Sequence, residues 1–189
     1  MKPDNIVLDS EGHALLTDFG LSKEGVFESM MTNSFCGSVA YLPPEMLNRG
    51  GHNHTVDLYL LGVLLYEMLT GAPPYYSAAK NELYYNILHQ KLKLPKKLTA
   101  SAKDLIIRLL DRDTSQRIGA KSMQEVKSHP WFSCIDWEAA LRRELRPVPV
   151  PEKRKKVPAV PLTMEKVLNG GGRQGPEVPG WSFVAGGSR

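Results

Sequence analysis

The most constraining stretch of the sequence is residues 55–70, TVDLYLLGVLLYEMLT, in which apolar side chains fall on every side of a helical projection. A helix with apolar side chains all round must be buried all round. A membrane span needs about 20 apolar residues, and this stretch is shorter and carries Asp57 and Glu67. It therefore predicts a central core helix. The Gly-Ala-Pro-Pro run at residues 71–74 should end it, because proline has no amide hydrogen to donate.

Other periodic stretches predict a mainly helical chain around that core. Helices are predicted over residues 80–90, 99–111 and 122–128. In the second, Thr99 is a candidate N-cap, because its side-chain oxygen can accept a first-turn amide hydrogen. The apolar stripe of this helix consists of Leu105, Ile106, Leu109 and Leu110.

A small hairpin is predicted near the N-terminus. Apolar runs at residues 6–8 and 14–16 flank a turn cluster at residues 9–12. Asn5 and Asp18 stand at the two ends of this hairpin, so the fold can bring an amide oxygen and a carboxylate together as hard ligands for Mg²⁺. The alternative is that both are ordinary turn residues.

Charge and cysteine content exclude several classes of protein. The net charge of +4 equals the charge of the basic run at residues 153–156, so no nucleic-acid-binding face is expected. That run is either a solvated linker or a nuclear address. Cys36 and Cys134 are too few for a disulfide framework, and no apolar signal core follows the N-terminus. A cytoplasmic location is expected, with the nucleus as the alternative.

Three motifs occur in a meaningful order: Lys-Pro-Asp-Asn at residues 2–5, Asp-Phe-Gly at residues 18–20 and Pro-Pro-Glu at residues 43–45. Together they resemble the signature set of protein kinases. Residues 32–38, Thr-Asn-Ser-Phe-Cys-Gly-Ser, and residues 129–132, His-Pro-Trp-Phe, resemble the AGC group of serine/threonine kinases.

The resemblance implies a fold and its boundaries. Residues 1–133 would form the C-terminal lobe of a kinase catalytic domain, which is helical with a small β-hairpin and is part of an α+β fold, and the N-terminal lobe would be absent. Residues 134–189 would form an AGC-like extension, largely extended or disordered. The sequence contains no glycine-rich phosphate loop and no His-Arg-Asp triplet before Lys2. We therefore expect the chain alone to be inactive, with the apolar surface of its core helix partly open.

The resemblance also implies an activity, which is transfer of a phosphoryl group from ATP, with Mg²⁺, to serine and threonine hydroxyls of protein substrates. It assigns Lys2 and Ser38 to catalysis, Asn5 and Asp18 to metal binding, and Asp4 and Glu67 to binding of substrate arginines. Lys2 would neutralise charge on the transferred group, and Ser38 would contact the catalytic aspartate and lysine. The acidic pair would make the substrate preference basophilic.

Regulatory and structural residues follow from the same resemblance. Ser34 falls on the position that the family phosphorylates, where a phosphate would order the loop and would require an upstream kinase. Ser182 lies in a weak match to the C-terminal hydrophobic motif; the alternatives are an unmodified Ser34 and an exposed apolar tail. The structural matches are Gly20, Asp57, Glu45 and Arg117, the last two as a buried ion pair.

Two other readings of the chain stay open. A shortened, non-catalytic kinase relative would act as a binding or regulatory module, and an unrelated globular domain would have neither role. The set of Lys2, Asn5 and Asp18 argues against a loss of catalysis, because a binding module needs no metal ligands.

Overall fold

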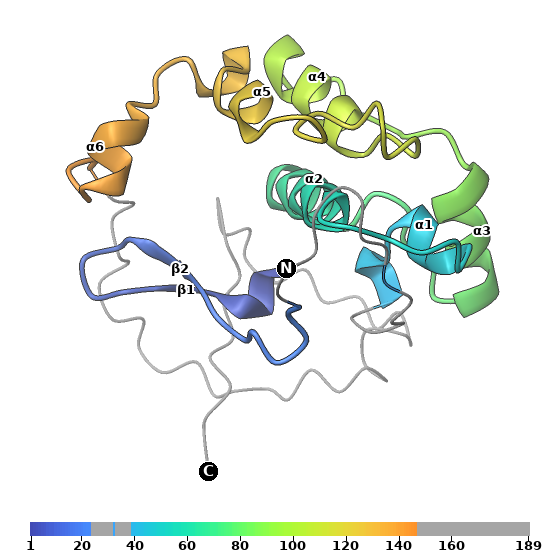
Figure 1. Cartoon of the computed structure of the whole chain (residues 1–189). Helices are drawn as coiled ribbons and strands as arrows, with labels where there is room; N and C mark the ends of the chain where they lie inside the picture. The colour runs from blue at the N-terminus through green and yellow to red at the C-terminus, as the bar shows by residue number, and fades with distance from the viewer. Residues whose placement is uncertain (24–31, 33–38, 147–189) are drawn as a thin grey trace, which may run out of the picture.

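A computed structural model describes residues 1–23, 32 and 39–146 of the chain (Figure 1). Its elements are η1 (Pro3–Asn5), β1 (Ile6–Leu8), β2 (Ala14–Leu16), η2 (Val39–Tyr41), α1 (Pro44–Leu47), α2 (Thr55–Thr70), α3 (Lys80–His89), α4 (Ala100–Leu109), α5 (Met123–Lys127), η3 (Pro130–Phe132) and α6 (Trp137–Leu141). The predicted fold class, helices with one small antiparallel hairpin, is confirmed.

Helix α2 has the bounds that the sequence predicts, but it ends for a different reason. Gly71 takes the left-handed conformation, with φ of 92°, and its amide donates to the Glu67 carbonyl at 2.7 Å. Glycine adopts that conformation without steric cost, which is why it commonly follows the last helical residues. The glycine therefore ends the helix, and the two prolines only follow it.

The core lies where α2 packs on α4 (Figure 1). Leu105, Ile106 and Leu109 of α4 are 0% exposed. Gly62 of α2 allows the close approach, since a Cβ there would lie 2.8 Å from the Leu109 Cβ. Thr99 caps α4 as predicted, its hydroxyl accepting the amide hydrogen of Ala102 at 3.2 Å.

The cover of α2 is incomplete. Met68 is 44% exposed, and Leu60, Leu61 and Leu65, which pack against the core, are only partly buried. Among the residues that the structure describes, α2 is therefore not buried all round, and its apolar surface is partly open, as expected for this chain.

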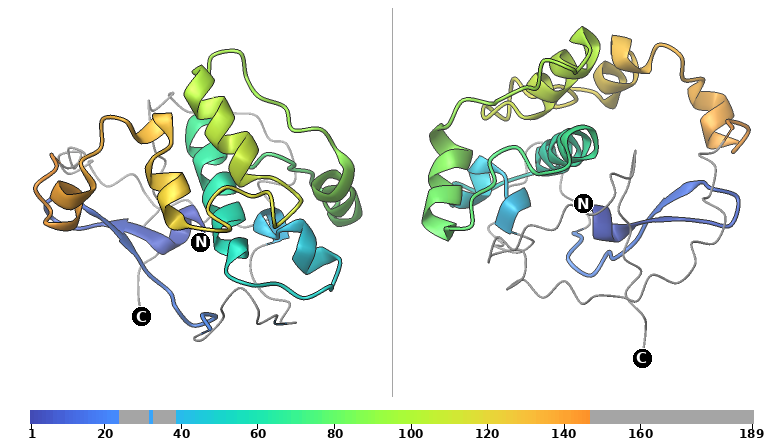
Figure 2. Two further views of the ribbon diagram at one scale, coloured as in Figure 1. Left: turned by 45° about the horizontal axis from the view of Figure 1, so that its top comes forward. Right: turned by 180° about the vertical axis from the view of Figure 1, so that it is seen from behind.

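The β1–β2 hairpin lies apart from the α2–α4 pair (Figure 2). Its register pairs Ile6 with Leu16 and Leu8 with Ala14. Asp9 orders the turn, because its Oδ1 accepts the amide hydrogens of Glu11 and His13, each at 2.9 Å. Leu8 and Leu16 are 38% and 44% exposed.

The described part of the expected C-terminal extension contains one short helix, α6. Asp136 caps it by accepting the amide hydrogens of Glu138 and Ala139 at 3.0 Å. In residues 1–23, 32 and 39–146, no helix has the length and apolar content that crossing a membrane requires.

Candidate functional site

A cavity of about 450 Å³ lies between the base of the hairpin and the first turns of α1 and α2. Lys2, Asn5 and Asp18 line it from the hairpin side. The opposite wall is formed mainly by Tyr41, Leu42, Pro43, Met46, His52, His54, Val56, Asp57 and Leu60. Three of the predicted site residues therefore share one cavity with the start of the core helix.

Asn5 and Asp18 lie together as their places at the ends of the hairpin predict, with 3.3 Å between Asn5 Nδ2 and Asp18 Oδ2. Thr17 secures the hairpin base, because its amide and hydroxyl both donate to the Asn5 carbonyl, at 2.8 and 3.1 Å. Asp18 has φ of 62°, a left-handed conformation that is uncommon for a residue with a side chain. Such conformations cluster at functional sites.

The oxygen atoms of Asn5 and Asp18 are ligands that suit Mg²⁺. The ion prefers oxygen ligands, and it is often held by one or two carboxylates together with substrate phosphates. A half-turn of the Asn5 amide would present its oxygen beside the Asp18 carboxylate. Among the described residues, no group of three or more His, Cys, Asp and Glu side chains could hold a metal alone. The pair therefore fits a metal that a phosphate ligand completes.

Gly20 and Lys2 flank the pair. The amide of Gly20 points to Asp18 Oδ1 at 3.4 Å. A Cβ on Gly20 would meet the same oxygen at an ordinary contact distance of 3.4 Å, so a close approach does not explain this glycine. The Lys2 ammonium lies 3.7 Å from a carboxylate oxygen of Asp4, whose side chain is 79% exposed. Lys2 thus places a cation on the wall that carries the carboxylate of Asp18.

Glu67, the second acidic residue assigned to substrate binding, accepts a hydrogen bond from the Tyr41 hydroxyl. Burial raises the pKa of the Tyr41 phenol, and the hydrogen bond to Glu67 raises it further. Tyr41 therefore stays protonated and donates. Sequence reasoning missed this tyrosine, because no local pattern connects it with a helix that begins many residues later.

Glu45 and Arg117 form the ion pair that the resemblance implies. The guanidinium donates from Nη1 and Nη2 to the two carboxylate oxygens of Glu45, at 2.7 and 3.0 Å. It also donates to the carbonyls of Thr55 and Asp111, at 2.7 and 3.0 Å. The Arg117 side chain is 0% exposed, and it lies 5.1 Å from the centre of the Tyr59 ring. The pair joins α1, the start of α2 and the loop after α4.

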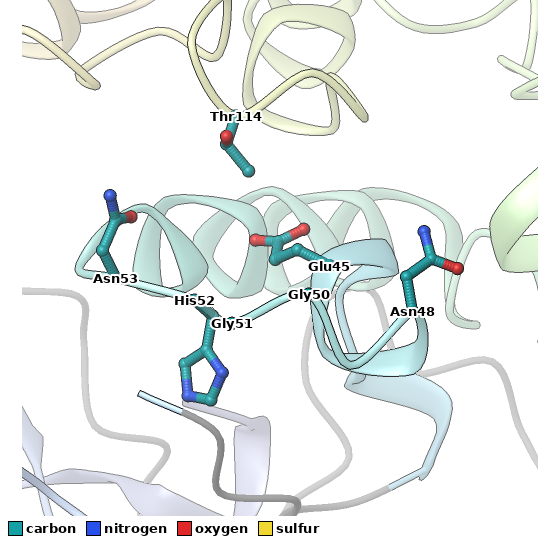
Figure 3. A pocket seen from close by; sticks show the side chains of 7 residues that line it. All are labelled: Glu45, Asn48, Gly50, Gly51, His52, Asn53 and Thr114. Carbon is teal, nitrogen blue, oxygen red and sulfur yellow. The ribbon is translucent and has the colours of Figure 1, made fainter. Parts of the chain in front are cut away.

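A second, smaller cavity of about 260 Å³ lies beside this ion pair, and Figure 3 shows the residues around it. Two of its polar side chains are already engaged: Glu45 binds Arg117, and Asn53 accepts hydrogen bonds from the amide and hydroxyl of Thr55. The imidazole of His52 points away from Thr114 (Figure 3). These contacts give the small cavity a structural role.

His52 also joins the loop before α2 to residue 32. The backbones of Thr32 and His52 exchange two hydrogen bonds, at 2.9 and 3.0 Å, and the Lys23 ammonium donates to the Thr32 hydroxyl. Burial lowers the pKa of the His52 imidazole, and the Lys23 charge lowers it further. The sequence pattern contains no sign of this bridge, because it is a single pairing outside any strand.

The remaining predicted residues are placed as follows. Asp57 is exposed at the start of α2 and lines the larger cavity. Ser34, Ser38 and Ser182 lie outside the described residues. The structure therefore gathers Lys2, Asn5, Asp18 and Asp57 around one cavity. Glu67 is linked to that cavity through its hydrogen bond with Tyr41, which lines it.

Comparisons with known proteins bear on this site. The protein kinase domain family matches residues 1–132. The chain is 50% identical over 145 residues to Protein kinase 2 of Dictyostelium discoideum, covering 77% of this chain and 30% of that protein. It is 46% identical over 148 residues to Serine/threonine-protein kinase Sgk1 of Homo sapiens, covering 78% and 34%. It is 48% identical over 149 residues to Serine/threonine protein kinase ypkA of Aspergillus fumigatus, covering 78% and 23%. The chain thus spans about a third or less of these relatives.

Proposed function

The chain belongs to the protein kinase domain family, and from that premise we propose that it is the metal-binding and substrate-facing part of a serine/threonine kinase. Its relatives confirm the resemblance to AGC-type kinases. Members of the family use ATP and Mg²⁺ and act on protein substrates. The observation that carries the proposal is the 3.3 Å contact between Asn5 and Asp18, beside a cavity that Lys2 also lines.

In this proposal each residue around the cavity has a defined task. Asp18 and Asn5 hold Mg²⁺ through carboxylate and amide oxygens, and the bound ion supplies charge neutralisation across the nucleotide phosphates. Lys2 holds its ammonium on the wall where charge on the transferred group needs a cation. The left-handed backbone of Asp18 and the amide of Gly20 support this assignment, since both act on the direction of the carboxylate.

The substrate preference that we propose is for arginine-containing peptides. Asp4 offers an exposed carboxylate, and the carboxylate of Glu67 accepts a hydrogen bond from the Tyr41 hydroxyl. We further propose that Ser34 and Ser182 are phosphorylated by an upstream kinase in the cytoplasm, with the nucleus as the alternative. Peptide libraries test the preference directly: a profile indifferent to basic residues would contradict it.

We also propose that the 189-residue chain does not transfer phosphate when it is alone. The support is that its sequence contains neither a glycine-rich phosphate loop nor a His-Arg-Asp triplet. The first test of function must therefore measure binding of metal and nucleotide rather than turnover.

Binding of Mn²⁺–ATP, followed by the relaxation of water protons, provides that measurement. Asp18→Asn should weaken binding roughly tenfold or more, because contacts to charged groups are worth about 1.5–3 kcal/mol. Glu11→Gln is the matched control, since it removes an exposed carboxylate from the same hairpin, outside the cavity. Equal affinities of the two variants would exclude the proposed metal site.

A further inference from the structure

Arg143, just past the end of α6, is held in an unusual conformation. Its amide donates to the Ala140 carbonyl at 3.1 Å, and the Glu144 amide donates to the Ala139 carbonyl at 2.8 Å. This is the Schellman pattern, in which the residue after the helix cap is left-handed and is usually glycine. Arg143 occupies that position with φ of 60°. An arginine there carries a steric cost that glycine would avoid.

The side chain of Arg143 reaches the tip of the hairpin. Its Nη1 lies 3.4 Å from Oδ2 of Asp9. Oδ1 of Asp9 accepts the amide hydrogens of Glu11 and His13. These two hydrogen bonds fix the direction of the carboxylate independently of Arg143. The Asp9 side chain is 19% exposed and that of Arg143 is 57% exposed. These exposed fractions place the pair at the surface. The Asp9 carboxylate is the preorganised partner.

The contact between Arg143 and Asp9 links two segments that are otherwise far apart in the sequence. Within the described residues, it is the one hydrogen bond or ion pair that joins residues 1–22 to residues 39–146. Figures 1 and 2 both place α6 at the turn end of the hairpin. The hairpin base, at the other end of the same two strands, carries Asn5 and Asp18.

The other end of α6 is attached to the helical part. The indole of Trp137 donates to the Lys127 carbonyl at 2.9 Å, and its ring lies 5.2 Å from that of Phe132. Helix α6 therefore connects α5 and η3, through Trp137, to the hairpin tip, through Arg143. The side chain of Arg143 thus makes a contact that a glycine at this position could not make.

We propose that Arg143 is a positioning residue, which tethers the tip of the hairpin to the helical part through Asp9 and so restrains the strands that carry Asn5 and Asp18. The meaning of that restraint for metal binding rests on the proposed function above. The tether itself does not, because it is a contact between two described segments.

Hydrogen exchange on the full chain tests the tether. Arg143→Gln should speed exchange of the hairpin amides of Asp9 and Thr17, roughly two- to fivefold, the range of surface ion pairs. Arg143→Lys should restore much of the protection. Arg142→Gln is the matched control, because Arg142 pairs locally with Glu144 and its loss should leave the hairpin unchanged.

Two further variants separate the tether from a local role in α6. Arg143→Gly removes the steric cost at the end of α6. A purely local role of Arg143 therefore predicts slower amide exchange in α6 and unchanged exchange in the hairpin, whereas the tether predicts faster exchange of the hairpin amides. Asp9→Asn keeps the Oδ1 acceptor of the turn and removes the charge. Its effect should not add to that of Arg143→Gln.

Additive effects, or equal effects of Arg142→Gln and Arg143→Gln, would overturn the proposal. A chain that shows the exchange pattern but binds no Mn²⁺–ATP would count against the metal site and would leave the tether intact. The two proposals therefore fail in different measurements.

Discussion

The helical part around α2 and α4 and the β1–β2 hairpin are built in opposite ways. In the helical part, leucines at 0% exposure pack on a glycine, and a fully buried arginine has its charge paired. In the hairpin, Leu8 and Leu16 are exposed, and among the described residues one ion pair, Asp9 with Arg143, links the hairpin to the helical part. The candidate metal ligands lie on the hairpin. The buried part thus supplies rigidity, whereas the candidate metal ligands lie at the segment with fewer restraints.

The largest effect should come from the buried ion pair. Arg117→Ala removes the partner of Glu45 and the guanidinium that donates to the carbonyls of Thr55 and Asp111. Breaking one partner of a buried pair typically costs about 3–5 kcal/mol. Chemical denaturation of the full chain measures this loss.

The control for this substitution is Arg108→Ala. Arg108 is 54% exposed and meets Asp104 at 4.0 Å on the surface of α4. Its loss should change stability by about 0.5 kcal/mol or less. If both variants unfold at the same denaturant concentration, the helical part does not depend on the ion pair and the contrast with the hairpin disappears.

A smaller loss is expected at the contact between α2 and α4. Gly62→Ala places a methyl group 2.8 Å from the Leu109 Cβ and 3.0 Å from a Leu110 methyl. Overpacking of this kind costs about 1–3 kcal/mol, which thermal unfolding can measure. Gly50→Ala is the control, since nothing lies within 4 Å of a Cβ at that position. A Gly62→Ala variant as stable as Gly50→Ala would show that the two helices are looser than the structure indicates.

Local sequence signals account for much of the fold. The bounds of α2, the cap at Thr99 and the pairing of β1 with β2 follow from apolar content, capping chemistry and a turn cluster. The nearness of Asn5 and Asp18 follows from their places at the two ends of that hairpin. In each case the cause lies within a few residues of the effect, or in the geometry of one hairpin.

The rest depends on tertiary placement. Glu45 and Arg117 are 72 positions apart, so only the family resemblance could pair them. The hydrogen bond between Tyr41 and Glu67, and the contact of Arg143 with Asp9, have no local pattern at all. The sequence also gives no signal for the end of α6, because the left-handed residue that follows a helix is normally glycine and here it is Arg143.

Acidification should lower the stability of the folded chain by a smaller amount, through the buried imidazole of His52. Burial lowers the folded-state pKa of His52 below its ordinary value of 6.5. Because the unfolded chain then binds a proton more readily, stability is fully present above pH 6.5 and falls as the pH drops toward the folded pKa. Denaturation at pH 7.5 and at lower pH measures the loss. His52→Gln should show a smaller loss, and an equal loss would assign the effect to other groups.

The smallest effect is expected in the hairpin itself. Leu16→Thr replaces a side chain that is 44% exposed with a residue that favours strands, so stability should change by about 0.5 kcal/mol or less. Leu105→Ala in α4 is the counterpart, where a fully buried leucine should cost about 2–5 kcal/mol. Thermal unfolding of both variants compares the two parts directly. If Leu16→Thr costs as much as Leu105→Ala, the exposed face of the hairpin is packed in solution, and the hairpin is as firmly held as the helices.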